Sequence, residues 1–174
     1  MHVALVPIGE VDSSILTALG EALSKELGCS FSVTEPLPDP DYAYNEERGQ
    51  YLSDAILTRL SSLTIPADRL LGIADLDLYT PGLNFVFGQA KLIGREAIIA
   101  LPRLRQEFYG LPSDEGLFRE RILKEAMHEL GHTFGLGHCP DPKCVMHFSN
   151  SLADTDVKGV KFCPRCRREF PFLQ

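Results

Sequence analysis

Three of the chain's five histidines lie within eleven residues, in the segment HELGHTFGLGH that covers residues 128–138. On a helix, residues four apart lie on one face, so His128 and His132 can direct two ring nitrogens to one point. Two ligands of one zinc ion must converge in this way. Gly135 allows the chain to leave the helix, and His138 can then return as a third ligand. Three protein ligands leave one coordination position for water, which is typical of a catalytic zinc site.

Glu129 follows the first of these histidines, where its carboxylate can reach the attacking water without binding the metal. The alternative is that the histidines are ordinary core or surface residues of a helix. Five apolar side chains fall in one arc of the expected helix: Ile122, Leu123, Ala126, Met127 and Leu130. His128 and His132 lie on the far side of that arc, so we expect them to face a cleft or solvent rather than the core.

Four of the five cysteines lie near the C-terminal end, as the pairs Cys139/Cys144 and Cys163/Cys166. Two cysteine pairs separated by a spacer are typical of a structural zinc site. Two disulfides are one alternative, which a reducing cytosol disfavours. A redox C-x-x-C motif is another, but it requires a thioredoxin-like setting that Cys163 lacks. We therefore expect four zinc-bound thiolates, whose negative charge the basic run at residues 161–168 offsets.

The two expected metal sites adjoin each other in the sequence. Only about forty residues follow Gly135, and a segment of that size rarely folds stably without a metal or a disulfide. Cys139 directly follows His138. A fixed Cys139 would therefore hold the third histidine ligand in place.

The hydrophobic pattern of the chain predicts alternating strands and helices. Strands are expected over residues 2–9, 31–37, 69–79, 84–93 and 95–101, and helices over 13–27, about 48–63, and from about 113 through the HELGH segment. Asp12 or Ser13 can cap the first helix, and Gly28 can end it. The short break at Gly94-Arg95 predicts an antiparallel pair of strands. The fold class is therefore α+β, with an α/β-like mixed sheet and helices packed on it.

Length, charge and composition limit the classes of protein to consider. At 174 residues, 44% hydrophobic and 24% charged, the chain is typical of one globular domain. The formal net charge of −7 argues against a nucleic-acid partner. No apolar stretch is long enough for a transmembrane span, and no signal peptide is recognisable at the start. We expect a cytoplasmic monomer, with an N-terminal subdomain over about 1–135 and a C-terminal subdomain over about 136–174.

Taken together, these residues resemble a known family. HELGHTFGLGH matches the metzincin signature HExxHxxGxxH, and Met146 fits the methionine turn that metzincins place beneath the metal. The four added cysteines resemble the archaemetzincins specifically. The resemblance implies His128, His132 and His138 as ligands of a catalytic zinc and Glu129 as the general base. It also implies that the four cysteines hold a structural zinc, which gives two zinc ions per chain.

Residues 77–90, DLYTPGLNFVFGQA, also resemble archaemetzincins, with less specificity. In metzincins, an edge strand above the cleft pairs with extended substrate. The resemblance places that strand within Asn84, Phe85, Val86, Phe87, Gly88, Gln89 and Ala90, and the cleft between the two subdomains. Phe148 occupies a position where some metzincins carry a tyrosine, and it has no hydroxyl group with which to stabilise an oxyanion.

The expected function is a zinc-dependent peptidase, in which metal-activated water attacks a peptide or protein substrate and Glu129 moves the proton. The alternative is a zinc-stabilised peptide-binding or regulatory protein with little or no turnover, which the small size and Phe148 motivate. The intact glutamate of the signature favours the peptidase.

Overall fold

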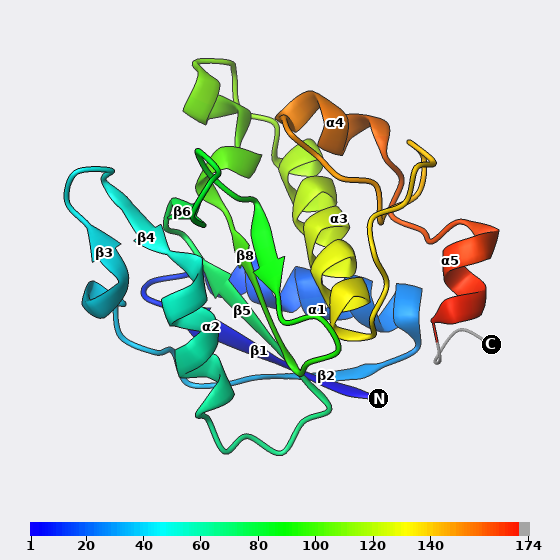
Figure 1. The fold of residues 1–174 in the computed structure, drawn as a ribbon, viewed down its shortest axis with the longest axis horizontal. Coiled ribbons are helices and arrows are strands. Elements are labelled where there is room, and N and C mark those ends of the chain that lie inside the picture. Colours follow the sequence, from blue (N-terminus) through cyan, green and yellow to red (C-terminus); the bar gives the residue numbers. More distant parts are fainter. Residues whose placement is uncertain (171–174) are drawn as a thin grey trace.

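A computed structural model describes residues 1–170, and its centre is a five-stranded sheet with strand order β2-β1-β5-β8-β7 (Figure 1). The strands are β1 (His2–Ile8), β2 (Ser30–Val33), β5 (Arg69–Ala74), β7 (Gly88–Ala90) and β8 (Glu96–Ala100). β1 pairs in parallel with β2 and β5, and β5 pairs in parallel with β8. β7 pairs antiparallel with β8, so the predicted mixed sheet and its antiparallel step are confirmed. β7 lies at one edge of the sheet.

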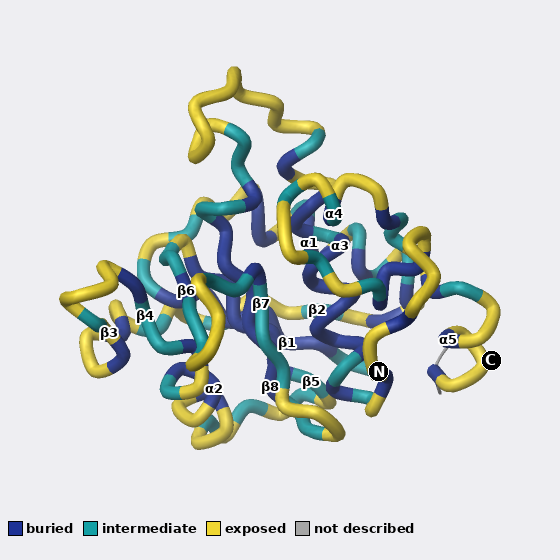
Figure 2. The backbone as a smooth tube through the Cα atoms, turned by 45° about the horizontal axis from the view of Figure 1, so that its top comes forward, coloured by how far each residue is buried: buried dark blue, intermediate teal, exposed yellow. Residues whose placement is uncertain are grey.

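Helices cover both faces of this sheet. They are α1 (Ser13–Leu27), α2 (Ser53–Ser61) and α3 (Glu115–Thr133). Side chains of β1 alternate between two hydrophobic clusters, as the period of a strand requires. Val3 and Leu5 pack with α1 and α3, whereas Ala4 and Val6 pack with α2 on the other face. Figure 2 shows the resulting buried residues along β1, β5 and β8, with many of the exposed residues in the loops.

Capping contacts fix the ends of two helices, and they confirm both predicted ends of α1. The Asp12 carboxylate accepts a hydrogen bond of 2.8 Å from the backbone N–H of Ser14, and Gly28 ends α1 in the left-handed conformation at φ 62°. α3 begins after Asp114, whose carboxylate accepts from the backbone N–H of Leu117 at 2.9 Å. This cap sets the start of the long helix that carries the HELGH segment.

The second helix begins five residues later than the sequence predicts. Residues Gln50–Leu52 instead form β4, which pairs with β3 (Tyr44–Asn45) and β6 (Leu78–Tyr79) in a separate small sheet. The Gln50 side chain donates to the Asp77 carboxylate and to the carbonyl of Asn84, both at 3.0 Å. These long-range hydrogen bonds outweigh the helical pattern that β4 shares with α2, and they position the segment that follows β6.

The remaining described elements are short. They are the 3₁₀ helices Asp41–Ala43, Pro102–Leu104 and Gln106–Tyr109 and the helices α4 (Leu152–Val157) and α5 (Pro164–Glu169). α4 packs against α3. Among residues 1–170, no helix is both long and apolar enough to cross a membrane.

The turn between β7 and β8 contains a strained residue. Ile93 has φ 53°, a left-handed conformation that no other non-glycine residue among the described ones adopts. A β-branched side chain in this conformation costs roughly 1–2 kcal/mol. Ile93 is 81% exposed, so burial recovers little of that cost.

We expect Ile93→Gly to be more stable than Ile93→Ala by about 0.5–1 kcal/mol in free energy of unfolding, because glycine relieves the strain and alanine keeps it. Chemical denaturation of both variants measures the difference. A glycine variant that is less stable than the alanine variant would show that the turn carries no such strain.

Candidate active site

The two histidines of the HELGH segment converge on one point. On α3, the Nε2 atoms of His128 and His132 lie 3.1 Å apart. The Nδ1 atom of His128 lies 2.8 Å from the carbonyl of Val145, and that of His132 lies 2.7 Å from the carbonyl of Leu136. Since a carbonyl only accepts, each Nδ1 carries the proton and donates it, and each Nε2 presents a lone pair.

This arrangement fits a zinc ion. Two unprotonated nitrogens at 3.1 Å repel each other unless a cation lies between them, and a tetrahedral zinc with Zn–N bonds of about 2.0–2.1 Å separates its ligand nitrogens by about 3.3–3.4 Å. His138 contributes a third nitrogen, and the three ligand atoms all lie within 4.8 Å of one another. Burial lowers the pKa of His128 well below its usual value, which favours the neutral form that binds metals.

Glu129 lies beside this three-histidine site and is almost fully buried. Burial raises the pKa of its carboxyl group well above the ordinary value, and the nearby charge of Glu125 raises it further. The backbone of Gly88 in β7 approaches the Glu129 side chain closely. A Cβ atom on Gly88 would lie 2.7 Å from Cγ of Glu129 and 2.8 Å from the carbonyl oxygen of Ile98, so only glycine fits here.

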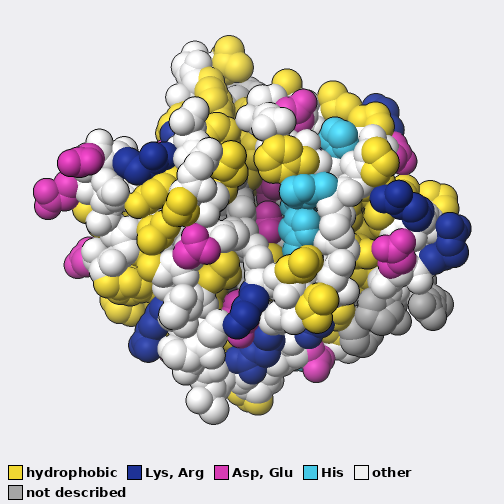
Figure 3. All heavy atoms as spheres, viewed as in Figure 1, with side chains coloured by type: hydrophobic (Ala, Val, Ile, Leu, Met, Phe, Trp, Pro, Cys, Tyr) yellow, Lys and Arg dark blue, Asp and Glu magenta, His cyan; other side chains and the backbone are white. Residues whose placement is uncertain are grey.

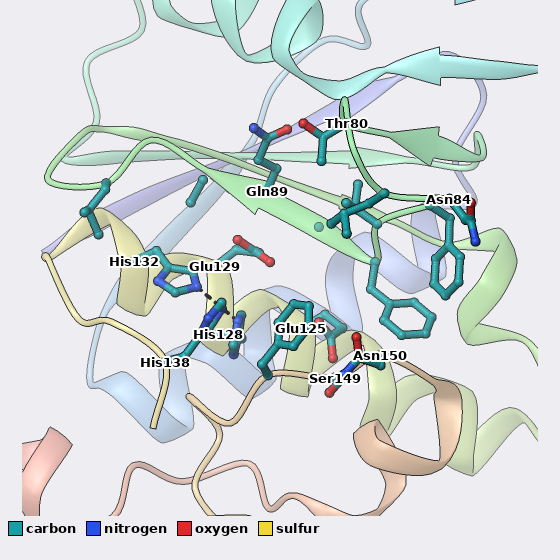
Figure 4. Close-up of a pocket in the computed structure, with 18 residues that line it drawn as sticks. Thr80, Asn84, Gln89, Glu125, His128, Glu129, His132, His138, Ser149 and Asn150 are labelled. Carbon is teal, nitrogen blue, oxygen red and sulfur yellow. Dashed lines mark hydrogen bonds between the residues drawn. The ribbon is translucent and has the colours of Figure 1, made fainter. Parts of the chain in front are cut away.

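A cleft of about 400 Å³ opens over the three-histidine site. Figure 3 shows histidine side chains in a hollow at the centre of this face, next to acidic side chains. Residues 83–90 line its upper wall, and His128, Glu129, His132 and His138 line its lower wall (Figure 4). All seven residues from Asn84 to Ala90 therefore lie at the cleft, although only the last three form an edge strand.

Met146 and Phe148 both lie close to the three-histidine site. Met146 is fully buried, and a Cβ atom on Gly131 would collide with its sulfur atom, so the two residues form a tight contact beneath α3. The ring of Phe148 lies 4.8 Å from that of His138 and lines the cleft. Phe148 therefore places an exposed apolar ring, and no hydroxyl group, beside His138.

The four cysteines also come together. Their sulfur atoms all lie within 4.8 Å of one another, and the sulfurs of Cys139 and Cys163 are 3.8 Å apart. A disulfide requires about 2.05 Å, whereas a tetrahedral zinc with Zn–S bonds of about 2.3 Å separates its sulfurs by about 3.8 Å. The backbone N–H of Cys166 lowers the pKa of Cys163 to about 7. Arg165 lies 3.8 Å from the Cys139 sulfur, as expected of the basic run.

Hydrogen bonds join the two ends of the loop at residues 139–147. The backbone N–H of Cys139 donates to the carbonyl of Met146, and the ring of His147 contacts the carbonyl of Cys139, both at 2.9 Å. The four-cysteine site and the three-histidine site therefore share one short segment of backbone.

A buried ion pair at the cleft has no counterpart among the residues predicted from the sequence. The ammonium nitrogen of Lys158 lies 3.0 Å from Oε1 of Glu125, with side-chain exposures of 0% and 3%. Glu125 precedes Glu129 by one helical turn, so its spacing alone places it on the cleft face. Lys158 follows 33 residues later, and no pattern in the sequence indicates the contact.

Comparisons with known proteins agree with this geometry. A family model described as Peptidase family M54 matches residues 37–171. An archaemetzincin of Methanocaldococcus jannaschii is 45% identical over 172 residues, which cover 97% of this chain and 92% of the relative. The crystal structure of an archaemetzincin from Archaeoglobus fulgidus, solved with malonate, matches with a TM-score of 0.86 and 37% identity over 98% of this chain and 100% of the other. A zinc-dependent peptidase from Methanocorpusculum labreanum matches with a TM-score of 0.86 and 31% identity, over 96% and 98% of the two chains.

We expect Gly88→Ala to lower the free energy of unfolding by about 1–3 kcal/mol, because its new methyl group meets Glu129 and the backbone of Ile98. Gly116→Ala, in the first turn of α3, is the matched control and has room for its methyl group. Chemical denaturation compares the two variants. Equal stability of Gly88→Ala and the unchanged protein would contradict the close approach of β7 to α3.

Proposed function

The chain belongs to peptidase family M54, the archaemetzincins, and we propose that it cleaves peptide bonds at the three-histidine site with Glu129 as the general base. As a member of this family, it is a zinc metallopeptidase and acts on peptides or proteins. The observation that carries the residue assignment is the convergence of His128 and His132 beside a buried carboxylate. The alternative of a peptide-binding protein with little turnover is not favoured by this family membership.

The proposed ligands of the catalytic zinc are His128, His132 and His138, whose donor atoms fit it as described above. When bound, zinc polarises the scissile carbonyl and lowers the pKa of a coordinated water. Glu129 accepts the proton of the attacking water and passes it to the leaving nitrogen. Its burial suits this role, because a carboxylate in a dry site is a stronger base than one in water.

The proposed substrate-binding edge is β7, the outermost strand of the large sheet. An extended peptide can add to this edge through backbone hydrogen bonds, and its side chains then contact the wall formed by residues 83–90. The absence of a side chain at Gly88 lets the peptide and Glu129 meet at the same point. The proposed floor of the three-histidine site is Met146, which is fully buried against Gly131 of α3.

We further propose a second, structural zinc at the four-cysteine site, whose ligands all belong to a C-terminal subdomain over about 136–174. It would hold that subdomain together beside an N-terminal subdomain over about 1–135. Burial raises the pKa of Cys144 and Cys166, so a bound cation is needed to keep all four groups as thiolates. Reduced thiolates also suit a cytoplasmic location. The cleft and both sites are built from one chain, which supports a functional monomer.

We expect Glu129→Gln to lower kcat/KM by roughly 10²–10⁴-fold, because the amide cannot accept the proton of the attacking water. The zinc-loaded protein is incubated with a diverse peptide library, and the new termini are identified by mass spectrometry. Glu21→Gln, an exposed substitution on α1, is the control. Undiminished cleavage by Glu129→Gln would exclude this residue as the base.

We expect two zinc ions per chain by elemental analysis. His132→Ala is expected to lose one of them by weakening the three-histidine site, and Cys163→Ser/Cys166→Ser is expected to lose the other and to unfold at a lower temperature. Cys29→Ser is the control, since this buried cysteine belongs to neither site. A single zinc in the unchanged, fully loaded protein would contradict the proposal of two sites.

A further inference from the structure

The cleft continues past Glu129 into a corner that neither the metal ligands nor the general base occupies. Figure 4 shows His132 toward one end of the cleft and Ser149 and Asn150 toward the other, with Glu125 beside them. We define the Glu125 corner by five cleft-lining residues: Glu125, Phe85, Phe87, Phe148 and Ser149. Three of them are aromatic, and two carry hydrogen-bonding groups.

Lys158 balances the negative charge of the Glu125 carboxylate from the side away from the cleft. Oε1 of Glu125 lies 3.0 Å from the Lys158 ammonium nitrogen and accepts from the Thr155 hydroxyl at 3.2 Å. The ammonium group of Lys158 also donates to the carbonyl of His147 at 3.5 Å. These two contacts hold the side chain of Lys158 inside the protein. Because Lys158 and Thr155 both contact Oε1 of Glu125, Oε2 remains as a hydrogen-bond acceptor for a group in the cleft. The corner therefore offers an acceptor without a net charge.

Ser149 supplies the second hydrogen-bonding group. Among residues 1–170, its Oγ atom is the only buried side-chain nitrogen or oxygen without a hydrogen-bond partner. A buried hydroxyl without a partner is unfavourable. A turn of this side chain toward the cleft, which Ser149 lines, would let a ligand group accept from the hydroxyl and relieve that cost. The rings of Phe85 and Phe87, in edge-to-face contact at 5.1 Å, form an apolar wall beside these two groups.

We propose that the Glu125 corner selects substrate side chains that end in a neutral carboxamide, as in glutamine or asparagine. This inference rests on the proposed peptidase function. The amide NH₂ donates to Oε2 of Glu125, and the amide carbonyl accepts from the Ser149 hydroxyl. A methionine side chain leaves both groups unpaired, and a carboxylate is repelled by Oε2. A lysine gains little, because Lys158 already balances the charge of Glu125.

The direction of β7 indicates which substrate residue enters the Glu125 corner. An extended peptide that adds antiparallel to β7 runs from the Ala90 end toward Gly88, and its C-terminal part then reaches Phe87 and Phe85. The Glu125 corner lies on that side of Glu129. It therefore receives the first substrate residue after the scissile bond.

The test compares peptides that differ only at this residue, with glutamine, methionine, lysine or glutamate, as substrates of the zinc-loaded protein. We expect kcat/KM for glutamine to exceed that for methionine by about 3–10-fold, the effect of one or two neutral hydrogen bonds. Glu125→Leu/Lys158→Met removes both charges together while keeping apolar volume, and it should bring this ratio close to one. Ser149→Ala should lower the ratio about threefold.

The control is Glu115→Ala/Arg119→Ala, which removes an exposed ion pair from the same helix and should leave the ratio unchanged. If the double variant at the corner does not fold, Ser149→Ala carries the test, because its hydroxyl makes no hydrogen bond in the free protein. A preference for lysine, or a glutamine preference that is undiminished in Ser149→Ala and in any folded corner variant, overturns the proposal.

Binding of the same peptides to zinc-loaded Glu129→Gln, measured by fluorescence anisotropy, separates the corner from the chemistry. Tighter binding of the glutamine peptide that Ser149→Ala reduces about threefold supports the corner, even if the unchanged protein cleaves none of the peptides. Cleavage and binding that are both equal for glutamine and methionine overturn the corner while the peptidase stands. Absence of both binding and cleavage for every peptide overturns both.

Discussion

The three-histidine site depends on two hydrogen bonds between histidine rings and backbone carbonyls. The carbonyls of Val145 and Leu136 fix the Nδ1 protons of His128 and His132, and this leaves both Nε2 atoms free to face one point. Both carbonyls belong to the chain after α3, so the helix alone does not determine the site. The loop that supplies them is held in turn by the hydrogen bond from Cys139 to Met146 and by the four-cysteine site.

A second constraint is the close approach of β7 to α3. The sheet presents its edge strand within contact distance of Glu129 because Gly88 has no side chain. The small sheet of β3, β4 and β6 fixes the segment before β7 through the hydrogen bond of Gln50 with Asn84. The upper wall of the cleft is therefore positioned by two sheets, and its lower wall by one helix and the loop that follows it.

Features that depend on residues close together in the chain were predictable from the sequence. The spacing of His128 and His132, the cap at Asp114 and the antiparallel pair around Gly94 each follow from residues that are near neighbours in the chain. β4 was not predictable, because its apolar residues continue the helical pattern of α2 and only distant partners pull them into a sheet. The pairing of Glu125 with Lys158 was hidden for the same reason, since two charged residues 33 positions apart leave no periodic signal.

The direct succession of His138 and Cys139 has a consequence for how this segment tolerates changes in length. Consecutive Cα atoms are about 3.8 Å apart, so one peptide unit spans the step between the two sites. The backbone there cannot accommodate an inserted or deleted residue, and a displacement of either site is transmitted to the other. The turn at Ile93 is exposed, yet it meets one of the two sites through the hydrogen bond from its backbone N–H to the carbonyl of His132 at 3.2 Å. Length variation in related chains should therefore accumulate in exposed loops outside both sites and be absent between the last histidine and the first cysteine.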